Sequence, residues 1–404
     1  MKLVMLVHEF PKASEPFLVD KFTGLIAHGF DVHLVAEQEL RGDYKMYPQL
    51  AENSGLRRRI HAWPQRSRPF ALLAMALREV AWALLLHPVR TATSIGKAFR
   101  HPLREVPGRF LFTLPLLRIA PDLIHFEFGS LAANRVDLVS WIAPRSSASF
   151  RGWDLNFFAL DEPERLRRVF ERVDRIHFVG EDLRRRARRR GLLGDTLSDV
   201  ISPAVDCSHF DASAHEPSRS GDVLQLVSVG RLHWKKGYEF ALQAIRRLLD
   251  AGIALEYRII GSGPFEGAVR TAIADLELSE FVTLLGKRSR EEVLAELKRA
   301  DLFLHAAVSE GFCNAVLEAQ AMGVPVVCSD ADGLPENVAH GSTGYVVPRR
   351  DSDSMADALL KLTRDPALRE RFGQAGTRRV RDHFDPAAQI RAFVDFYENA
   401  ESDS

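Results

Sequence analysis

Short apolar runs alternate with longer stretches of helical periodicity along the whole chain. This alternation predicts parallel β-sheets covered by helices on both faces. In the first half we expect strands at Lys2–Val7, Asp31–Ala36, Leu123–Phe126, Ser147–Phe150, Arg175–Val179 and Asp199–Ile201. In the second half we expect strands at Leu224–Val229, Glu256–Ile260, Val282–Leu285, Leu302–His305, Val324–Cys328 and Gly344–Val347.

A polar stretch, Asp211–Asp222, interrupts this alternation and has the composition of an exposed linker. The break predicts two doubly wound α/β domains, one before the stretch and one after it. Sheets of this kind bind ligands beyond the carboxyl ends of their strands. Two facing domains would therefore form a ligand cleft between them.

Composition agrees with two folded domains. The chain has 404 residues, 46% of them hydrophobic, which suffices for two apolar cores and argues against disorder. The three cysteines, Cys207, Cys313 and Cys328, lack the short paired spacings of metal sites and disulfide frameworks, so we expect buried thiols and no metal. The chain starts with a strand-like run instead of a secretory signal, which predicts a cytoplasmic protein.

The formal net charge is zero, but the first half is basic. Residues 41–118 carry 14 Lys or Arg against 4 Asp or Glu, and residues 165–190 carry 11 against 4. The apolar stretches Phe70–Leu77, Val80–Leu86 and Phe110–Leu117 are too short to span a membrane. They fit a helix lying on an anionic membrane surface, and equally fit buried helices with solvated basic edges. A peripheral position on the inner face of the membrane stays open.

Two glycine-containing turns follow strands of the second half. In Gly230–Gly237 (GRLHWKKG), the cations Arg231 and Lys236 lie between a strand and a helix expected near Tyr238, which suits a diphosphate. A solvated basic turn is the alternative. The turn Gly261-Ser262-Gly263-Pro264 follows the next strand. By itself it predicts a tight turn before a helix, and it supports a ligand site only together with the Gly230–Gly237 turn.

The segment Ser309–Ala319 (SEGFCNAVLEA) is the sharpest candidate for a ligand site. Glu310 precedes an expected helix, and Glu318 lies a little over one turn inside it. A helix start near Phe312–Asn314 would offer free N–H groups to phosphate, while the carboxylates would accept hydrogen bonds from sugar and ribose hydroxyls. Alternatively, Glu310 caps the helix and Glu318 pairs with a basic neighbour.

The order of these motifs resembles the retaining GT-B glycosyltransferases of family 4, the group 1 glycosyl transferases. The resemblance covers essentially the whole second half and adds Gly-Leu-Pro-Glu at 333–336 and Gly-x-Thr-Gly at 341–344. In the first half, Phe10–Phe17 (FPKASEPF) resembles the opening of members that build exopolysaccharides. Ile201–Phe210 resembles the segment leading into the interdomain linker.

The resemblance implies a GT-B fold, in which two Rossmann-like domains face each other across a cleft. The acceptor-side domain would be residues 1–210, the linker 211–222 and the donor domain 223–384, with a final helix in 385–404 crossing back. Arg231 and Lys236 would bind the diphosphate, Glu310 the sugar hydroxyls and Glu318 the ribose. The implied donor site comprises Arg231, Lys236, Gly261, Gly263, Lys287, Arg288, Glu310, Gly311, Phe312, Cys313, Asn314 and Glu318.

Two departures from the family pattern lie in the first half. Glu127 replaces the second histidine of His-x-His-Phe-Gly, and Arg151 replaces the histidine of His-Gly-x-Asp. We hypothesise that Glu127 and Arg151 form a salt bridge, with two independent surface substitutions as the alternative. The catalytic candidates are Glu310, Arg231, Lys236, His125 and Glu127, and the acceptor-side candidates are Ser14, Glu15, Arg151 and Asp154.

The predicted function is retaining transfer of a hexose-type sugar from a UDP- or GDP-sugar to a glycan, glycolipid or small-molecule acceptor. No metal or other cofactor is expected, and no nucleic acid partner. A lipid-linked acceptor would suit the basic, apolar segment of the first half. The alternatives are a non-catalytic nucleotide-sugar-binding protein and a GT-B epimerase or phosphorylase. The donor base, the linkage and the oligomeric state stay open.

Overall fold

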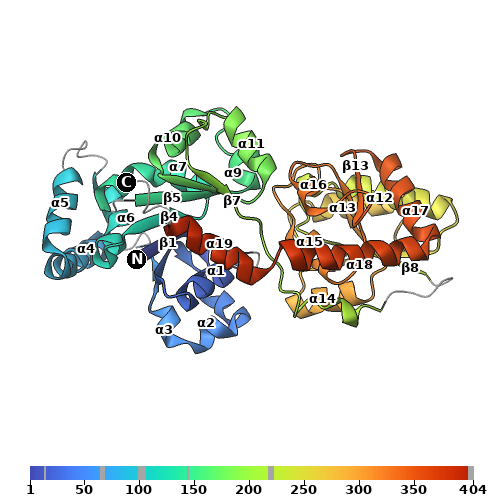
Figure 1. Cartoon of the computed structure of the whole chain (residues 1–404), viewed down its shortest axis with the longest axis horizontal. Helices are drawn as coiled ribbons and strands as arrows, with labels where there is room; N and C mark the ends of the chain where they lie inside the picture. The colour runs from blue at the N-terminus through green and yellow to red at the C-terminus, as the bar shows by residue number, and fades with distance from the viewer. Residues whose placement is uncertain (13–14, 64–68, 99–105, 143–144, 217–222, 399–404) are drawn as a thin grey trace. The chain divides into compact units, whose positions relative to one another are not determined.

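The computed structural model describes residues 1–12, 15–63, 69–98, 106–142, 145–216 and 223–398. The chain divides into two compact units, each with its own parallel sheet (Figure 1). Unit 1 contains Met1–Phe178, Arg184–Ile201 and the chain from Ile390 onward, and unit 2 contains Val179–Leu183 and Ser202–Gln389. The doubly wound α/β class expected from the sequence is confirmed. The domain boundaries at 210, 222 and 384 stay predictions.

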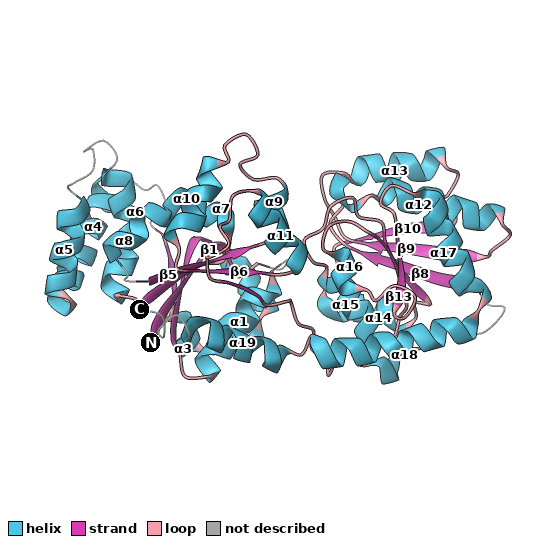
Figure 2. Cartoon of the chain, turned by 45° about the horizontal axis from the view of Figure 1, so that its top comes forward, coloured by secondary structure: helices cyan, strands magenta, loops and turns pink. Residues whose placement is uncertain are grey.

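The sheet of unit 1 has the strand order β3-β2-β1-β4-β5-β6-β7, and its strands run parallel. Figure 2 shows helices on both faces, which explains why the apolar runs of β1 and β4 are almost wholly buried. The strands are β1 (Lys2–Phe10), β2 (Asp31–Glu39), β3 (Ile60–Ala62), β4 (Leu123–Phe126), β5 (Arg145–Phe150), β6 (Arg175–Phe178) and β7 (Ser198–Val200).

Of these strands, β3 is the one that the sequence did not predict. It is a three-residue Ile-His-Ala run at the sheet edge, and none of its residues is buried, so no apolar pattern marks it. The helices are α1 (Pro16–Ala27), η1 (Arg41–Met46), α2 (Pro48–Glu52), α3 (Ser54–Arg57), α4 (Pro69–Leu86), α5 (Pro88–Ala98), α6 (Val106–Ile119), α7 (Gly129–Arg135), η2 (Val136–Leu138), α8 (Val139–Ile142), α9 (Gly152–Asn156), α10 (Glu164–Arg172), and most of α11 (Glu181–Arg189) and α19 (Pro386–Glu398), whose first residues belong to unit 2.

Helices α4, α5 and α6 lie between β3 and β4 in the chain, and α4 and α6 contain the three apolar stretches noted above. Arg90 of α5 donates hydrogen bonds to the carbonyl oxygens of Ala120, at 3.1 Å, and Ile142, at 2.8 Å, which fixes α5 to the segment before β4 and to the end of α8. Within the described residues, none of the helices is long and apolar enough to cross a bilayer.

Unit 2 has the strand order β10-β9-β8-β11-β12-β13, also parallel, and all six strands expected from the sequence are present. They are β8 (Leu224–Val229), β9 (Leu255–Ile260), β10 (Val282–Gly286), β11 (Leu302–His305), β12 (Val326–Ser329) and β13 (Gly344–Val347). Successive strands are added toward one edge from β8 to β10 and toward the other edge from β11 to β13, so the strand order reverses between β8 and β11. This is the switch point where such sheets bind ligands. The helices are η3 (Ala212–Ala214), η4 (Trp234–Lys236), α12 (Tyr238–Asp250), α13 (Glu266–Asp275), α14 (Arg290–Lys298), α15 (Asn314–Ala321), α16 (Leu334–Asn337), α17 (Ser352–Arg364) and α18 (Pro366–His383).

Candidate functional site

The candidate residues of unit 2 lie after four adjacent strands, β10, β9, β8 and β11, in the loops that follow them and in the first turns of α15. Parallel strands place their carboxyl ends at one edge of the sheet, so these loops meet beside the switch point. The loop after β8 packs directly on the loop after β11, because the N–H groups of Val308 and Ser309 donate to the carbonyl oxygen of Lys235. The loops that carry Lys236 and Glu310 are therefore in direct contact.

An ion pair between Lys236 and Glu310 connects these two loops. The Lys236 ammonium donates to Oε2 of Glu310, and the two side chains are only 12% and 11% exposed. Burial alone would raise the pKa of Glu310, but Lys236 and His305 outweigh it and hold this pKa well below its usual range. The carboxylate is therefore ionised, and its charge is matched by a cation from the neighbouring loop.

Two glycines allow this close packing. Gly237 has φ 62°, and a Cβ there would lie 2.2 Å from the carbonyl oxygen of Ala306. Gly261 has φ 146°, and a Cβ there would lie 1.9 Å from the carbonyl oxygen of Gly230. A side chain at either position would separate the loops, so both glycines are required by the backbone.

Asp332 anchors the loop that carries Glu310, and the sequence did not single it out. Its Oδ2 accepts hydrogen bonds from the Ser309 hydroxyl at 2.6 Å and from the Glu310 N–H at 3.1 Å. Its Oδ1 pairs with Arg349 at 3.0 Å. Asp332 lies in the Asp330–Glu336 turn, directly before the Gly-Leu-Pro-Glu motif. Its position beside that motif is the feature of the sequence that could have identified it as a site residue.

Helix α15 begins at Asn314, within the region that the sequence predicted. Its N-cap residue, Cys313, makes no side-chain capping bond. Instead, the Asn337 amide accepts from the Cys313 N–H at 3.3 Å and donates to the Cys313 carbonyl oxygen at 3.1 Å. Asn337 thereby fixes the helix start, where the first N–H groups are available to an anion.

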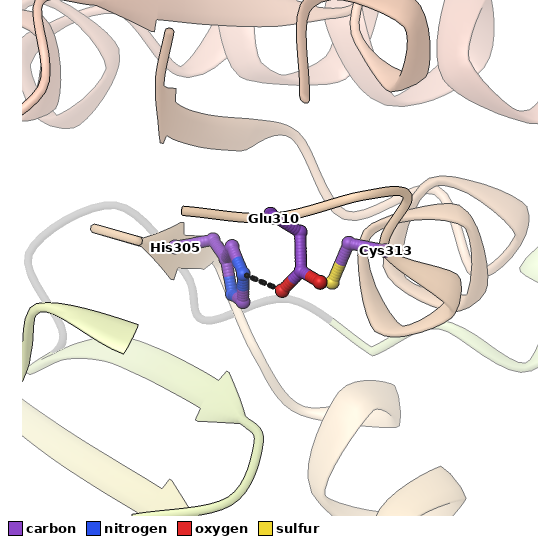
Figure 3. A group of neighbouring side chains, drawn as sticks. All are labelled: His305, Glu310 and Cys313. Carbon is purple, nitrogen blue, oxygen red and sulfur yellow. Dashed lines mark hydrogen bonds and ion pairs between the residues drawn. The ribbon is translucent and has the colours of Figure 1, made fainter. Parts of the chain in front are cut away.

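Figure 3 shows the Glu310 carboxylate between the imidazole of His305 and the thiol of Cys313. His305 Nε2 lies 3.4 Å from Oε2 of Glu310. Burial would raise the pKa of the Cys313 thiol, but His305 and Lys236 outweigh it and lower this pKa. One ligand atom from each of His305, Glu310 and Cys313 lies within 4.8 Å of the others. These three residues could hold a metal ion, although the cysteine spacing in the sequence gave no such indication.

The remaining donor-site candidates differ in their exposure. Arg231, Lys287 and Arg288 lie on the surface, and Arg288 pairs with Glu292 at 3.0 Å. Glu318 is half-buried in α15, and burial raises its pKa to about 7 against the opposing charge of Arg290. Of the other candidates, Gly311 is buried, Phe312 and Asn314 are half-buried, and Gly263 packs its Cα against the Leu232 backbone.

In unit 1 the Glu127–Arg151 salt bridge is confirmed. Arg151 Nη2 lies 3.1 Å from Oε2 of Glu127, which is fully buried. The structure adds a second cation, because Lys21 of α1 donates to Oε1 of Glu127 at 2.7 Å. Lys21 lies between the buried positions Leu18 and Leu25 on the apolar face of α1. A lysine on that face indicates a buried charge with a partner, and the sequence analysis did not use this signal.

His125 and Asp154 are also buried in unit 1. His125 contacts the hydroxyls of Ser147 and Ser149 at 2.8 Å each, and burial together with Lys21 holds its pKa well below the usual range. Asp154 accepts from the N–H of Arg151 at 2.9 Å and so caps α9. Glu15 pairs with Lys12 at 3.5 Å. Ser14 lies outside the described residues.

Comparison with known proteins identifies relatives of this chain. The sequence pattern described as "Glycosyl transferases group 1" matches residues 211–379. The colanic acid biosynthesis glycosyltransferase WcaL of Salmonella typhimurium is 28% identical over 90% of this chain and 91% of its own length. The amylovoran biosynthesis glycosyltransferase AmsK of Erwinia amylovora is 27% identical over 91% and 92%. A GDP-mannose-dependent alpha-(1-6)-phosphatidylinositol monomannoside mannosyltransferase of Mycobacterium tuberculosis is 32% identical over 61% and 67%.

Solved structures of the same architecture cover the whole chain. Sucrose-phosphate synthase from Thermosynechococcus elongatus superposes with a TM-score of 0.73 and 16% identity, covering 100% of both chains. Anabaena Alr3699/HepE in complex with UDP-glucose gives a TM-score of 0.72 and 14% identity, covering 99% of this chain and 100% of the other. At these identities the likeness establishes the GT-B fold.

Proposed function

The chain belongs to the group 1 glycosyltransferase family and transfers sugar from a nucleotide sugar, and on this premise we propose that the Lys236–Glu310 pair is the centre of its donor site. This ion pair is the observation that carries the proposal. A buried carboxylate matched by a cation can exchange that partner for sugar hydroxyls while the cation turns to phosphate.

In this proposal each group of the site has one role. Lys236 and Arg231 bind the diphosphate, together with the first N–H groups of α15. Glu310 accepts hydrogen bonds from hydroxyls of the transferred sugar, and Glu318 does so from the ribose. Gly286–Arg288 lies against the base. The reacting bond runs from the sugar's anomeric carbon to the diphosphate oxygen.

Catalysis then rests on stabilising the leaving diphosphate. As the bond to the anomeric carbon breaks, negative charge grows on the departing oxygen, which Arg231, Lys236 and the start of α15 stabilise. The acceptor hydroxyl attacks from the same face, and the departing phosphate takes its proton, so the configuration is retained. Glu310 orients the sugar through hydrogen bonds and forms no covalent bond to it.

Unit 1 supplies the acceptor side in this proposal. His125 and Glu127 are fully buried and hydrogen-bonded among their neighbours, so we assign them positioning roles rather than contact with substrate. Arg151 is partly exposed and bonded to Glu127, which makes it the member of the group best placed to meet an acceptor. The exposed apolar face of α4 favours an acceptor carried on a lipid.

Substitution of the two cations tests the donor site. Lys236→Ala and Arg231→Ala should each lower kcat/KM. The decrease should correspond to a loss of about 2–4 kcal/mol of transition-state stabilisation, as expected when a preorganised charge is removed. UDP-glucose and GDP-mannose serve as donors, and release of the nucleoside diphosphate is followed. Arg299→Ala is the control, because Arg299 forms an exposed pair with Glu296 and should leave turnover unchanged.

Glu310→Ala separates the role of Glu310 from that of the cations. It should reduce transfer more than nucleotide binding, since the nucleoside diphosphate carries no transferred sugar. A variant that loses nucleotide affinity but keeps its turnover at saturating donor would contradict the sugar-facing role. Full activity of both cation variants would rule out the proposed centre.

A further inference from the structure

Three different ligand atoms converge beside β11: an imidazole nitrogen of His305, a carboxylate oxygen of Glu310 and the sulfur of Cys313. These atoms lie within 4.8 Å of one another (Figure 3). His305 and Cys313 are almost fully buried, and both come from backbone that is firmly held. His305 ends β11, and Cys313 is fixed through Asn337. The cluster is therefore preorganised rather than formed by chance on a mobile surface.

We propose that His305, Glu310 and Cys313 form a binding site for one borderline-soft divalent cation of the Zn²⁺ type, and that the bound cation blocks the donor site. Nitrogen, sulfur and carboxylate ligands together suit Zn²⁺ and disfavour Mg²⁺, which prefers oxygen ligands alone. Three protein ligands leave a fourth tetrahedral position for water.

The distances fit this cation after a small adjustment of side chains. Zinc lies about 2.0–2.3 Å from its ligand atoms, so tetrahedral ligands are separated by roughly 3.3–3.8 Å. His305 Nε2 already lies 3.4 Å from Glu310 Oε2. The widest separation in the cluster is 4.8 Å or less, and rotation of the Cys313 or Glu310 side chain closes the difference. On binding, the thiol loses its proton to solvent and the sulfur becomes a thiolate ligand.

Lys236 disfavours binding of the cation, because its ammonium is already paired with the carboxylate of Glu310. It donates to Oε2 of Glu310, so the cation uses Oε1 or displaces the ammonium. This competition predicts that the charge of Lys236 affects metal binding and diphosphate binding in opposite directions. Removing the ammonium should strengthen metal binding, whereas the same substitution weakens a diphosphate ligand.

Cobalt binding to the untagged full chain tests the site directly. Co²⁺ reports a thiolate ligand through its sulfur-to-metal absorption band, and Zn²⁺ should abolish that band at one equivalent. Cys313→Ser should eliminate the band, and His305→Ala should weaken Co²⁺ binding at least tenfold. Cys207→Ser is the matched control, since Cys207 is a half-buried thiol outside the cluster and should keep the band. Lys236→Met should bind Co²⁺ more tightly than the unmodified chain.

Two results would overturn the inference. One is absence of a thiolate band in the unmodified chain at millimolar Co²⁺, and the other is a band that persists in Cys313→Ser. A circular dichroism spectrum of each variant matching the parent excludes loss of the fold as the explanation. These binding readouts need no donor and no transfer, so they are independent of the proposed function.

The blocking effect rests on the proposed function and has its own readout. Zn²⁺ should inhibit transfer competitively with the donor, and Cys313→Ser should raise the inhibition constant at least tenfold relative to Cys207→Ser. UDP-glucose or GDP-mannose should displace Co²⁺ from the cluster. If the cluster binds Co²⁺ as described but no donor displaces it, the assignment of Glu310 to the donor fails while the metal site stands.

Discussion

Glu318 gives the donor site a dependence on pH near neutrality. Burial raises the pKa of this carboxyl to about 7, and the proposed ribose contact requires its ionised form as hydrogen-bond acceptor. Donor affinity should therefore increase as the pH rises through 7. If only the carboxylate binds, a sugar nucleotide should bind about tenfold more tightly at pH 8 than at pH 6. Isothermal titration calorimetry with UDP-glucose or GDP-mannose measures this dependence.

Glu318→Gln provides the control, because an amide of the same shape does not titrate. Its affinity should be lower at pH 8 and nearly constant between pH 6 and pH 8. An intact sugar nucleotide is the suitable ligand, since its phosphodiester groups keep their charge over this range. A pH dependence that is the same in the unmodified chain and in Glu318→Gln would assign the effect to another group.

Gly237 offers a second prediction about a single residue. Its φ of 62° costs an L-residue about 1–2 kcal/mol, and an alanine Cβ would also meet the carbonyl oxygen of Ala306 at 2.2 Å. Gly237→Ala should therefore lower the free energy of unfolding by more than about 2 kcal/mol and weaken donor binding. Gly252→Ala is the matched control, because Gly252 has φ 80° with open space around its Cα. It should cost only the strain of about 1 kcal/mol, measured by urea unfolding; equal costs at the two positions would contradict the packing argument.

At the scale of elements, a buried charge network holds α1, β4, α9 and α19 together in unit 1. Lys21 of α1 and Arg151, the N-cap of α9, both contact Glu127, which follows β4. The Lys21 ammonium also lies 3.9 Å from the ring centroid of Phe393 in α19. The Lys21 ammonium thus connects the Glu127 carboxylate to α19, near the other end of the chain.

This network predicts how stability responds to alkaline pH. Burial lowers the pKa of Lys21 to about 8 despite the attraction of Glu127, whereas in the unfolded chain it stays near 10.5. Between these values the unfolded chain binds more protons, so the contribution of Lys21 to the free energy of unfolding rises with pH. The difference in unfolding free energy between the unmodified chain and Lys21→Met should increase by on the order of 2 kcal/mol from pH 8 to pH 10.5. Urea unfolding at several pH values measures it.

Lys12→Met is the control for this experiment. Lys12 is partly exposed, and nearby Glu9 and Glu15 keep its pKa above the usual value despite some burial, so its removal should give no increase over the same range. A difference for Lys21→Met that stays flat or falls with pH would mean that Lys21 is not desolvated in the folded protein.

How far the sequence predicted these elements depends on the kind of signal each one carries. Strands covered on both faces must be apolar throughout, so β1 and β8 could be recognised from their residues alone. The edge strand β3 has no such requirement and was missed. The Glu310 motif could be predicted because glycines and a helix start mark it locally. The roles of Asp332 and Lys21 could not, since each depends on a partner brought close only by the fold.

On the scale of the whole molecule, helix α4 exposes large apolar side chains that the protein core does not cover. Leu77, Trp82 and Leu85 of α4 are 63%, 51% and 72% exposed, and their spacing places them on one face of the helix. Arg78 lies on the same face and is also exposed. A mixture of large apolar side chains and a cation is typical of helices that lie at a membrane surface. We therefore expect this face to bind vesicles that contain anionic lipid.

Co-sedimentation with vesicles of mixed phosphatidylcholine and phosphatidylglycerol measures that binding. Trp82 and Leu85 should each add about 1–2 kcal/mol by burying apolar surface, so Trp82→Ser with Leu85→Ser should reduce the partition coefficient at least tenfold. Leu193→Ser is the control, because Leu193 is 62% exposed but lies outside α4–α6. Higher salt should weaken binding without abolishing it, since the apolar contribution is not screened. Equal partitioning of the double variant and the control would show that the α4 face is not the lipid-binding surface, and a lipid-linked acceptor would then lose its structural support.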